Sequence, residues 1–141
     1  MEKPRLVLDT NVVLSAVLKP DGLQRLIFQV ALSPFCEVFV SAPIVAEYED
    51  VLSRKKFKLQ ADEVKAVMRL IKTKAVLVVP KSRVMVAHDP DDNMFLECAE
   101  EAKANYLITG NKKHFPAKWK QTKVVSGREI MDLMLRGLLE L

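Results

Sequence analysis

Residues 5–11 read RLVLDTN, and this short stretch predicts the class of the fold. Residues 6–8 are apolar, and the run ends abruptly at Asp9. A short run that is apolar throughout is typical of a strand buried on both faces, as the strands of parallel sheets are. A helical pattern follows directly, over about residues 11–17. A buried strand that leads straight into a helix is the first part of a β-α-β unit, so the stretch predicts an α/β domain.

The same alternation continues along the chain. Apolar residues at helical spacing recur over residues 23–30 and 64–71. Further strand-like runs occupy residues 37–41, 75–79, 106–109 and 123–125, with helices predicted at 43–53 and 93–104. Ser126 and Glu129 have the spacing of a capping box for a last helix. We therefore predict an α/β fold, a three-layer α/β/α sandwich around a parallel sheet of about five strands, with residues 1–141 in one domain.

The composition is that of a globular protein and not of a membrane-spanning or disordered one. Half of the 141 residues are hydrophobic and 28% are charged, which is typical of a globular domain. No apolar run reaches the ~18 residues that a membrane span needs, and the first residues show no signal-peptide pattern, so we expect a cytoplasmic protein without a membrane partner. Cys36 and Cys98 lack metal-ligand spacing and are predicted to be reduced, buried thiols. The net charge of +4 favours a polyanionic partner only weakly.

Three carboxylates stand where a parallel α/β sheet forms its ligand-binding edge. Asp9 ends the first strand, Glu47 lies one turn into the helix after the second strand, and Asp92 opens a helix after an acidic turn. Each also has an ordinary interpretation: Asp9 and Asp92 as helix caps, and Glu47 as a solvated helical acid. Three carboxylates on one edge would repel one another without a cation, and hard oxygen ligands favour Mg²⁺ or Mn²⁺. Such ions activate water and stabilise charge on a phosphate, which predicts phosphodiester chemistry.

Four segments around these acids resemble the motifs of the PIN-domain family. They are residues 8–12 (LDTNV), 43–47 (PIVAE), 89–99 (DPDDNMFLECA) and 106–111 (YLITGN). Their order and spacing are most similar to the VapC-like branch, the toxins of toxin–antitoxin pairs, and the resemblance spans essentially the whole chain. It implies an Mg²⁺- or Mn²⁺-dependent ribonuclease with an RNA substrate, an antitoxin protein as partner, and a homodimer or higher homo-oligomer.

The resemblance also assigns roles to single residues. Asp9, Glu47 and Asp92 fall on the family's catalytic, metal-binding acids. Supporting positions are occupied by Asn11, Thr109, Asn111 and Asp89. Asn111 stands where the family usually has a fourth acid, and its amide brings no negative charge, although Asp89 or Asp91 could compensate. This departure leaves an alternative open, a non-catalytic or weakly active PIN-type domain that binds RNA or docks a partner protein.

Two basic runs are candidates for contacts with nucleic acid. One covers residues 54–58 (RKKFK), and the other begins at Lys112 and Lys113 and continues to Phe115. Cationic and aromatic side chains together can hold phosphates and stack bases. Lys112 and Lys113 follow the strand that ends near the predicted site, so we predict that they bind nucleic acid. The ordinary alternative for both runs is a solvated helix end or loop.

Overall fold

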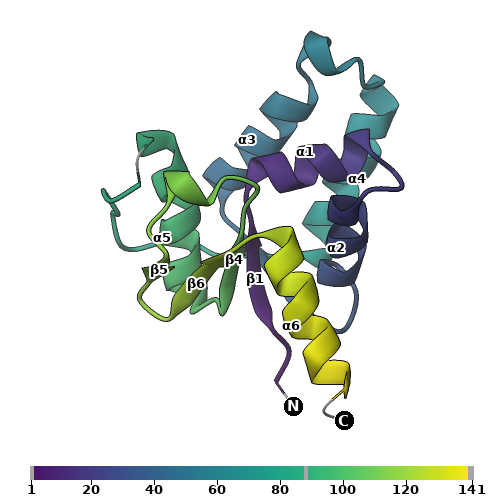
Figure 1. Ribbon diagram of the computed structural model, residues 1–141. Helices are drawn as coiled ribbons and strands as arrows, with labels where there is room; N and C mark the ends of the chain where they lie inside the picture. The colour runs from purple at the N-terminus through teal and green to yellow at the C-terminus, as the bar shows by residue number, and fades with distance from the viewer. Residues whose placement is uncertain (1, 88, 140–141) are drawn as a thin grey trace.

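A computed structural model of the chain describes residues 2–87 and 89–139 and shows strands alternating with helices (Figure 1). The strands of the described residues are β1 (Arg5–Leu8), β2 (Glu37–Val40), β3 (Val76–Leu77), β4 (Tyr106–Ile108), β5 (Lys118–Trp119) and β6 (Thr122–Val125). The α-helices are α1 (Thr10–Leu18), α2 (Leu23–Ala31), α3 (Ala42–Leu52), α4 (Ala61–Lys74), α5 (Asn93–Ala102) and α6 (Gly127–Leu139). Three short 3₁₀ turns are η1 (Lys55–Phe57), η2 (Pro90–Asp92) and η3 (Lys112–His114).

The strands form one sheet in the order β3-β2-β1-β4-β6-β5. All neighbouring pairs from β3 to β6 are parallel, which confirms the predicted α/β architecture. The antiparallel strand β5 was not predicted, because two residues in a hairpin with β6 are too short to show a pattern. The strand predicted at residues 75–79 is shorter in the structure, where β3 has two residues, both exposed at the edge of the sheet.

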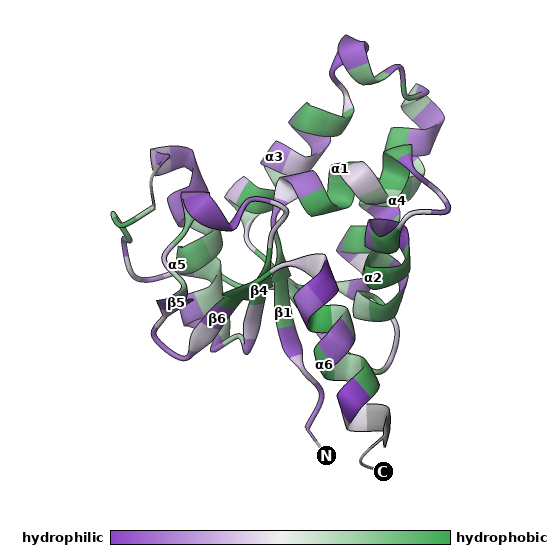
Figure 2. Cartoon of the chain, viewed as in Figure 1, coloured by the Kyte–Doolittle hydropathy of each residue, from purple (hydrophilic) through white to green (hydrophobic). Residues whose placement is uncertain are grey.

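The central strand β1 lies in the middle of the core. Leu6, Val7 and Leu8 are almost completely buried, as the apolar run predicted. The helix α5 packs on β1, β2 and β4, while α1, α2 and α6 lie on the other side of the strands (Figure 1). Figure 2 shows the same division by hydropathy: the central strands are hydrophobic, and the hydrophilic residues of the helices turn outward.

The last helix begins as predicted. The Ser126 N–H donates to Glu129 Oε1 (2.9 Å) and the Glu129 N–H donates to Ser126 Oγ (3.1 Å), so the capping box is confirmed. Between these residues, Gly127 allows α6 to approach α2, since a Cβ there would lie 2.7 Å from Ile27 Cδ1. Both cysteines are free and buried, as expected. No helix among residues 2–87 and 89–139 has the length and apolarity needed to cross a membrane.

The strand register brings distant polar residues to one edge. Leu8 is paired with Ile108, and Ile108 with Val125. The ladders continue one step further, because the Asp9 N–H donates to the Ile108 carbonyl and the Thr109 N–H to the Val125 carbonyl, both at 2.9 Å. Asp9 and Thr109 therefore follow adjacent parallel strands at their carboxyl ends, where ligands bind in this architecture.

Candidate metal centre

Asp9 is a buried carboxylate, 6% exposed, at the junction of β1 and α1. Its Oδ1 accepts a hydrogen bond from the Thr10 N–H (2.8 Å) and its Oδ2 accepts one from Thr109 Oγ1 (2.7 Å). Asp9 is also the N-cap of α1, so the ordinary interpretation of this residue holds beside the functional one. Burial raises the pKa of Asp9, the hydrogen bonds from Thr109 and Thr10 oppose that rise, and the negative charge of Glu47 adds to it.

Glu47 reaches the same edge from α3. Its Oε2 accepts a hydrogen bond from Thr10 Oγ1, so Thr10 links it with Asp9. The next residue, Tyr48, is buried and donates its hydroxyl to the Leu8 carbonyl, which holds α3 against the end of β1. Burial raises the pKa of Tyr48 well above its ordinary value and keeps this donor protonated. Neither Thr10 nor Tyr48 was identified from the sequence as part of the site.

Asp92 approaches the centre from η2, ahead of α5. Asp92 occupies the N-cap position of α5, as its ordinary interpretation predicts, but its side chain makes no capping hydrogen bond and is free to face the centre. Burial, followed by the negative charges of Asp9 and Asp89, raises the pKa of Asp92 to about 6. His114 opposes this rise, and its Nδ1 lies 3.4 Å from Asp92 Oδ2. Asp92 is thus close enough to Asp9 for the two carboxylates to repel each other.

Asn111 and His114 form a small polar chain beside Asp92. The Asn111 N–H donates to Thr109 Oγ1 (2.9 Å), and Asn111 Nδ2 lies 3.0 Å from His114 Nε2. The two ring nitrogens of His114 therefore face Asn111 on one side and Asp92 on the other. His114 was not among the site residues predicted from the sequence. Its spacing of three from Asn111 across the 3₁₀ turn η3 was the available signal, because such residues lie above one another.

The remaining predicted site residues surround this centre. Asn11 Oδ1 accepts the Gly110 N–H (3.2 Å), which joins α1 to the loop after β4. Asp89 is exposed, and its carboxylate accepts the Asp91 N–H (3.0 Å) at the start of η2. Lys112 Nζ lies 2.7 Å from Glu129 Oε1, so this lysine is already paired. Lys113 is exposed and forms no ion pair within the described residues, which makes it the freer cation of the two.

The three predicted acids are electrostatically coupled but do not yet form a ligand cluster. Within residues 2–87 and 89–139, no three acidic, histidine or cysteine side chains stand close enough together to hold an ion as they are. The donors around Thr10 are nevertheless all hard oxygens. Burial first, and then neighbouring carboxylates, raise the pKa of Asp9 and of Asp92, and a bound cation would favour the charged form of both. This donor set fits Mg²⁺ or Mn²⁺, whereas zinc prefers nitrogen and sulfur. Convergence of Asp9, Glu47 and Asp92 on one ion stays a prediction.

Comparisons with known proteins identify the family and the fold of the chain. The sequence pattern of the PIN domain matches residues 5–113. The uncharacterized protein MJ1680 of Methanocaldococcus jannaschii is 31% identical over 113 residues, which cover 78% of this chain and 72% of that protein. The fold is similar to that of a chain in the structure of VapBC2 from Rickettsia felis bound to a DNA fragment from their promoter. The TM-score is 0.60 and the sequence identity is 13%, and the match covers 86% of this chain and 98% of that one. The T. brucei RRP44 PIN domain is also similar, with a TM-score of 0.52 and 8% identity over 98% of this chain and 84% of that one.

Proposed function

This chain belongs to the PIN-domain family, and from that premise we propose that it is a divalent-metal-dependent ribonuclease that hydrolyses RNA phosphodiesters. The observation that carries the proposal is the buried carboxylate of Asp9, held from two sides by Thr10 and Thr109. A buried acid with a raised pKa destabilises a metal-free protein, and such groups gather at functional sites. Glu47 and Asp92 add two further carboxylates to the same edge.

Each residue of the centre has a distinct task in this proposal. Asp9, Glu47 and Asp92 hold Mg²⁺ or Mn²⁺, which when bound supplies Lewis-acid stabilisation of phosphate charge and an activated water. Thr109 orients the Asp9 carboxylate through its hydroxyl. Asn111 orients His114, and the Nδ1 side of the His114 ring faces Asp92. Outer hydrogen bonds of this kind set the position of a metal-binding carboxylate.

We further propose that the protein is the toxin of a toxin–antitoxin pair and self-associates as a homodimer or higher homo-oligomer. The VapC-like order of its motifs and a fold similar to a chain of the VapBC2 structure support this assignment. Expression together with the neighbouring reading frame should yield a stable complex with a small protein whose release restores RNA cleavage. A chain that purifies alone and shows no inhibition by that protein would contradict the toxin assignment.

A non-catalytic RNA-binding domain is the second candidate. It is favoured by Asn111, since an amide occupied with His114 adds no negative charge for a metal. It is also favoured by the absence of a ready ligand cluster in the part of the chain that the structure describes. The two candidates differ in one measurable property, which is metal-dependent cleavage.

The test is cleavage of single-stranded RNA by the purified protein with Mn²⁺ or Mg²⁺, and with a chelator. Asp9→Asn should lower the rate by more than about 100-fold, because even outer-sphere changes at metal sites cost 10- to 100-fold. Its Tm without metal should stay the same or rise, since the substitution relieves repulsion between carboxylates. Equal cleavage by the variant would point to a contaminating nuclease. RNA binding by the wild type without cleavage would select the second candidate.

A further inference from the structure

The excess positive charge of this protein lies in one segment. Residues 49–74, which comprise the last turn of α3 and all of η1 and α4, contain eight Lys and Arg but four Asp and Glu, for a net charge of +4. The whole chain has 22 basic and 18 acidic residues, so the remainder has 14 of each and is neutral. We call residues 49–74 the basic arm; α3, η1 and α4 stand at the top of Figure 1. Its charge is a local feature and not a general property of the surface.

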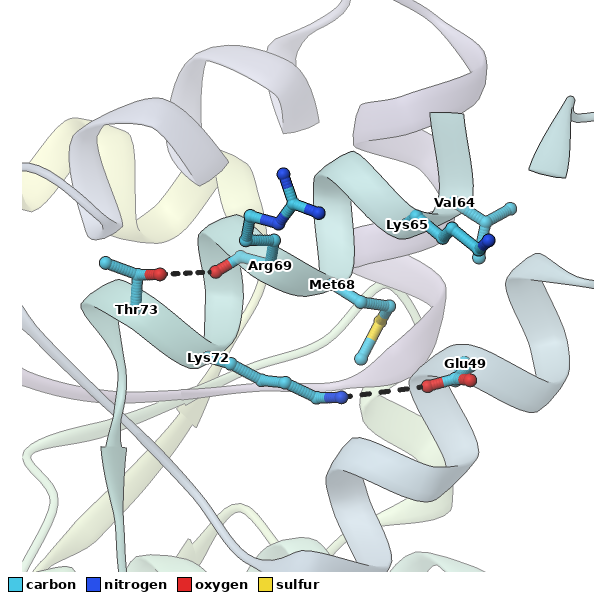
Figure 3. Close-up of a pocket in the computed structure, with 7 residues that line it drawn as sticks. All are labelled: Glu49, Val64, Lys65, Met68, Arg69, Lys72 and Thr73. Carbon is cyan, nitrogen blue, oxygen red and sulfur yellow. Dashed lines mark hydrogen bonds and ion pairs between the residues drawn. The ribbon is translucent and has the colours of Figure 1, made fainter. Parts of the chain in front are cut away.

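A groove of about 380 Å³ runs between the two helices of the basic arm. Buried Val64 and Met68 line it on the α4 side, and Glu49 lines it on the α3 side (Figure 3). Three cations of α4 stand along it, at Lys65, Arg69 and Lys72. Their spacing of four and three residues places them on one face of the helix, about 6 and 4.5 Å apart along its axis.

Two of these cations, Lys65 and Arg69, are not explained by the stability of the fold. Lys72 Nζ lies 3.9 Å from Glu49 Oε2, with both side chains more than half exposed to solvent. Lys65 and Arg69 form no ion pair with any residue that the structure describes. Like charges three or four residues apart destabilise a helix. Lys72 lies in the last turn of α4, where the helix dipole favours a cation. A partner that carries repeated negative charges accounts for the other two cations, Lys65 and Arg69.

The groove lies across α3 from the candidate metal centre. Glu47 points to Thr10 of α1, whereas Glu49 points to Lys72 of α4. Residues two apart on a helix lie about 200° apart around its axis, so the two acids are on opposite sides of α3, separated by roughly one helix diameter of ~10 Å. The exposed residues near the start of α3 are small and uncharged: Ala42, Pro43 and Ala46. A polyanionic strand can cross α3 there without meeting an acid.

We propose that the groove between α3 and α4 binds the phosphate backbone of single-stranded RNA on its way to or from the metal centre. The proposal rests on the ribonuclease function above and names the surface that holds the substrate. Single-stranded RNA carries one negative charge per nucleotide, and proteins that bind it without sequence preference use a positively charged groove that follows the backbone. The three cations along the groove match a chain of phosphates, each of which carries one negative charge.

The experiment measures binding of a fluorescein-labelled single-stranded RNA of about 16 nucleotides by anisotropy, in chelator so that no cleavage occurs. Lys65→Gln/Arg69→Gln should weaken binding about tenfold and reduce the salt slope by about 1.4, since each neutralised single-strand phosphate contributes ~0.7. The matched control is Lys123→Gln/Arg136→Gln, which also removes one exposed lysine and one exposed arginine but outside the basic arm. The control should bind nearly as the wild type does, and Lys65→Arg should retain full affinity.

Cleavage by the same proteins with Mn²⁺ separates this proposal from the ribonuclease assignment. The groove variant should raise the KM for the long RNA about tenfold and leave kcat unchanged, because both substituted residues lie outside the metal centre. If the wild type cleaves RNA and the groove variant behaves as its control does, the groove proposal is overturned while the ribonuclease function stands. The groove would then be assigned to the binding of a protein partner. If no protein cleaves RNA but the groove variant alone loses affinity, the groove proposal stands and the ribonuclease assignment fails.

Discussion

The two halves of the candidate metal centre are built differently. In the strand half, Asp9 is buried at the end of β1, and both of its carboxylate oxygens accept hydrogen bonds from Thr10 and Thr109. In the loop half, Asp92 lies in a 3₁₀ turn, lacks a capping hydrogen bond and has the imidazole of His114 at 3.4 Å. The strand half is positioned by the register of the parallel sheet. The loop half is positioned by contacts between side chains of two short turns, η2 and η3.

This difference shows which carboxylate the fold already stabilises in the absence of metal and which one it leaves repelled by its neighbours. The carboxylate of Asp9 is oriented by folding itself, because β1 and β4 are paired residue by residue up to this point. Asp92 has its pKa raised to about 6 by burial and by neighbouring charge. A cation would therefore stabilise the loop half more than the strand half, since a cation offsets repulsion that hydrogen bonds leave uncompensated.

The largest effect is expected from breaking the strand half at Thr109. Thr109→Val keeps the shape of this fully buried side chain but removes the donor to Asp9 and the acceptor for the Asn111 N–H. Metal affinity and cleavage should fall by about 10- to 100-fold, as for other outer-sphere partners. Stability should fall by about 1–3 kcal/mol, because a buried acceptor loses its partner. Thr109→Ser is the matched control, and a metal titration followed by cleavage and by Tm should leave it near wild type. Equal losses in Val and Ser variants would show a packing effect only.

A smaller effect, in the opposite direction, is expected from adding charge to the loop half. Asn111→Asp places a carboxylate near the predicted ion, where two unit charges ~4 Å apart interact by about 4 kcal/mol at an effective dielectric of 20, before desolvation. A net gain of ~1.4 kcal/mol tightens metal binding tenfold. An N–H at His114 Nε2, the atom that faces this side chain at 3.0 Å, would pair with the new carboxylate and offset part of its charge. The Mn²⁺ concentration for half-maximal cleavage should therefore fall about tenfold, and further in Asn111→Asp/His114→Gln. If neither variant moves the titration, Asn111 is not part of the metal site.

The pH dependence of stability tests the loop half without metal. The pKa of Asp92 is raised from 3.8 to about 6 in the folded protein, so between these values the folded state binds more protons than the unfolded state. The contribution of Asp92 therefore favours folding at low pH and is lost as pH rises through about 6. Asp92→Asn should raise the Tm by a few degrees at pH 7.5, since 1 kcal/mol shifts such a domain by about 4 °C, and should change it little at pH 4. Thermal scans in chelator at both pH values are the measurement. An equal shift at the two pH values would contradict this account of Asp92.

The smallest effect concerns the two lysines beside the loop half. Lys112 is paired with Glu129 at 2.7 Å, whereas Lys113 is exposed without an ion pair in the described chain. Lys113→Ala should reduce the slope of log affinity against log salt by about 0.7 for single-stranded RNA. Lys112→Ala should change the slope less, because its charge is already offset by Glu129. RNA binding across a range of salt concentrations compares the two variants. The reverse order would show that Lys112 leaves Glu129 to bind phosphate.

Local patterns were sufficient for most of the architecture. The apolar run ending at Asp9 predicted the buried central strand, and Ser126 with Glu129 predicted the start of α6 from two side chains three residues apart. These features depend on neighbours in the chain, so they can be read without knowing the fold. The two-residue strand β5 could not be read in this way, because its pairing with β6 and not its composition makes it a strand.

By itself, the sequence determined the α/β class, the order of the elements and the identity of the candidate acids, because apolar periodicity and strand-end positions are local properties. Only the tertiary structure decided how these acids are held. Asp9 and Thr109 are 100 residues apart, and they meet because the register of β1 against β4 places them side by side. The tertiary structure also adds three residues to the centre, because each contacts a residue on another element: Thr10, Tyr48 and His114. A hydrogen bond across such a separation leaves no periodic trace in the chain, and it exists only after packing has brought its donor and acceptor together.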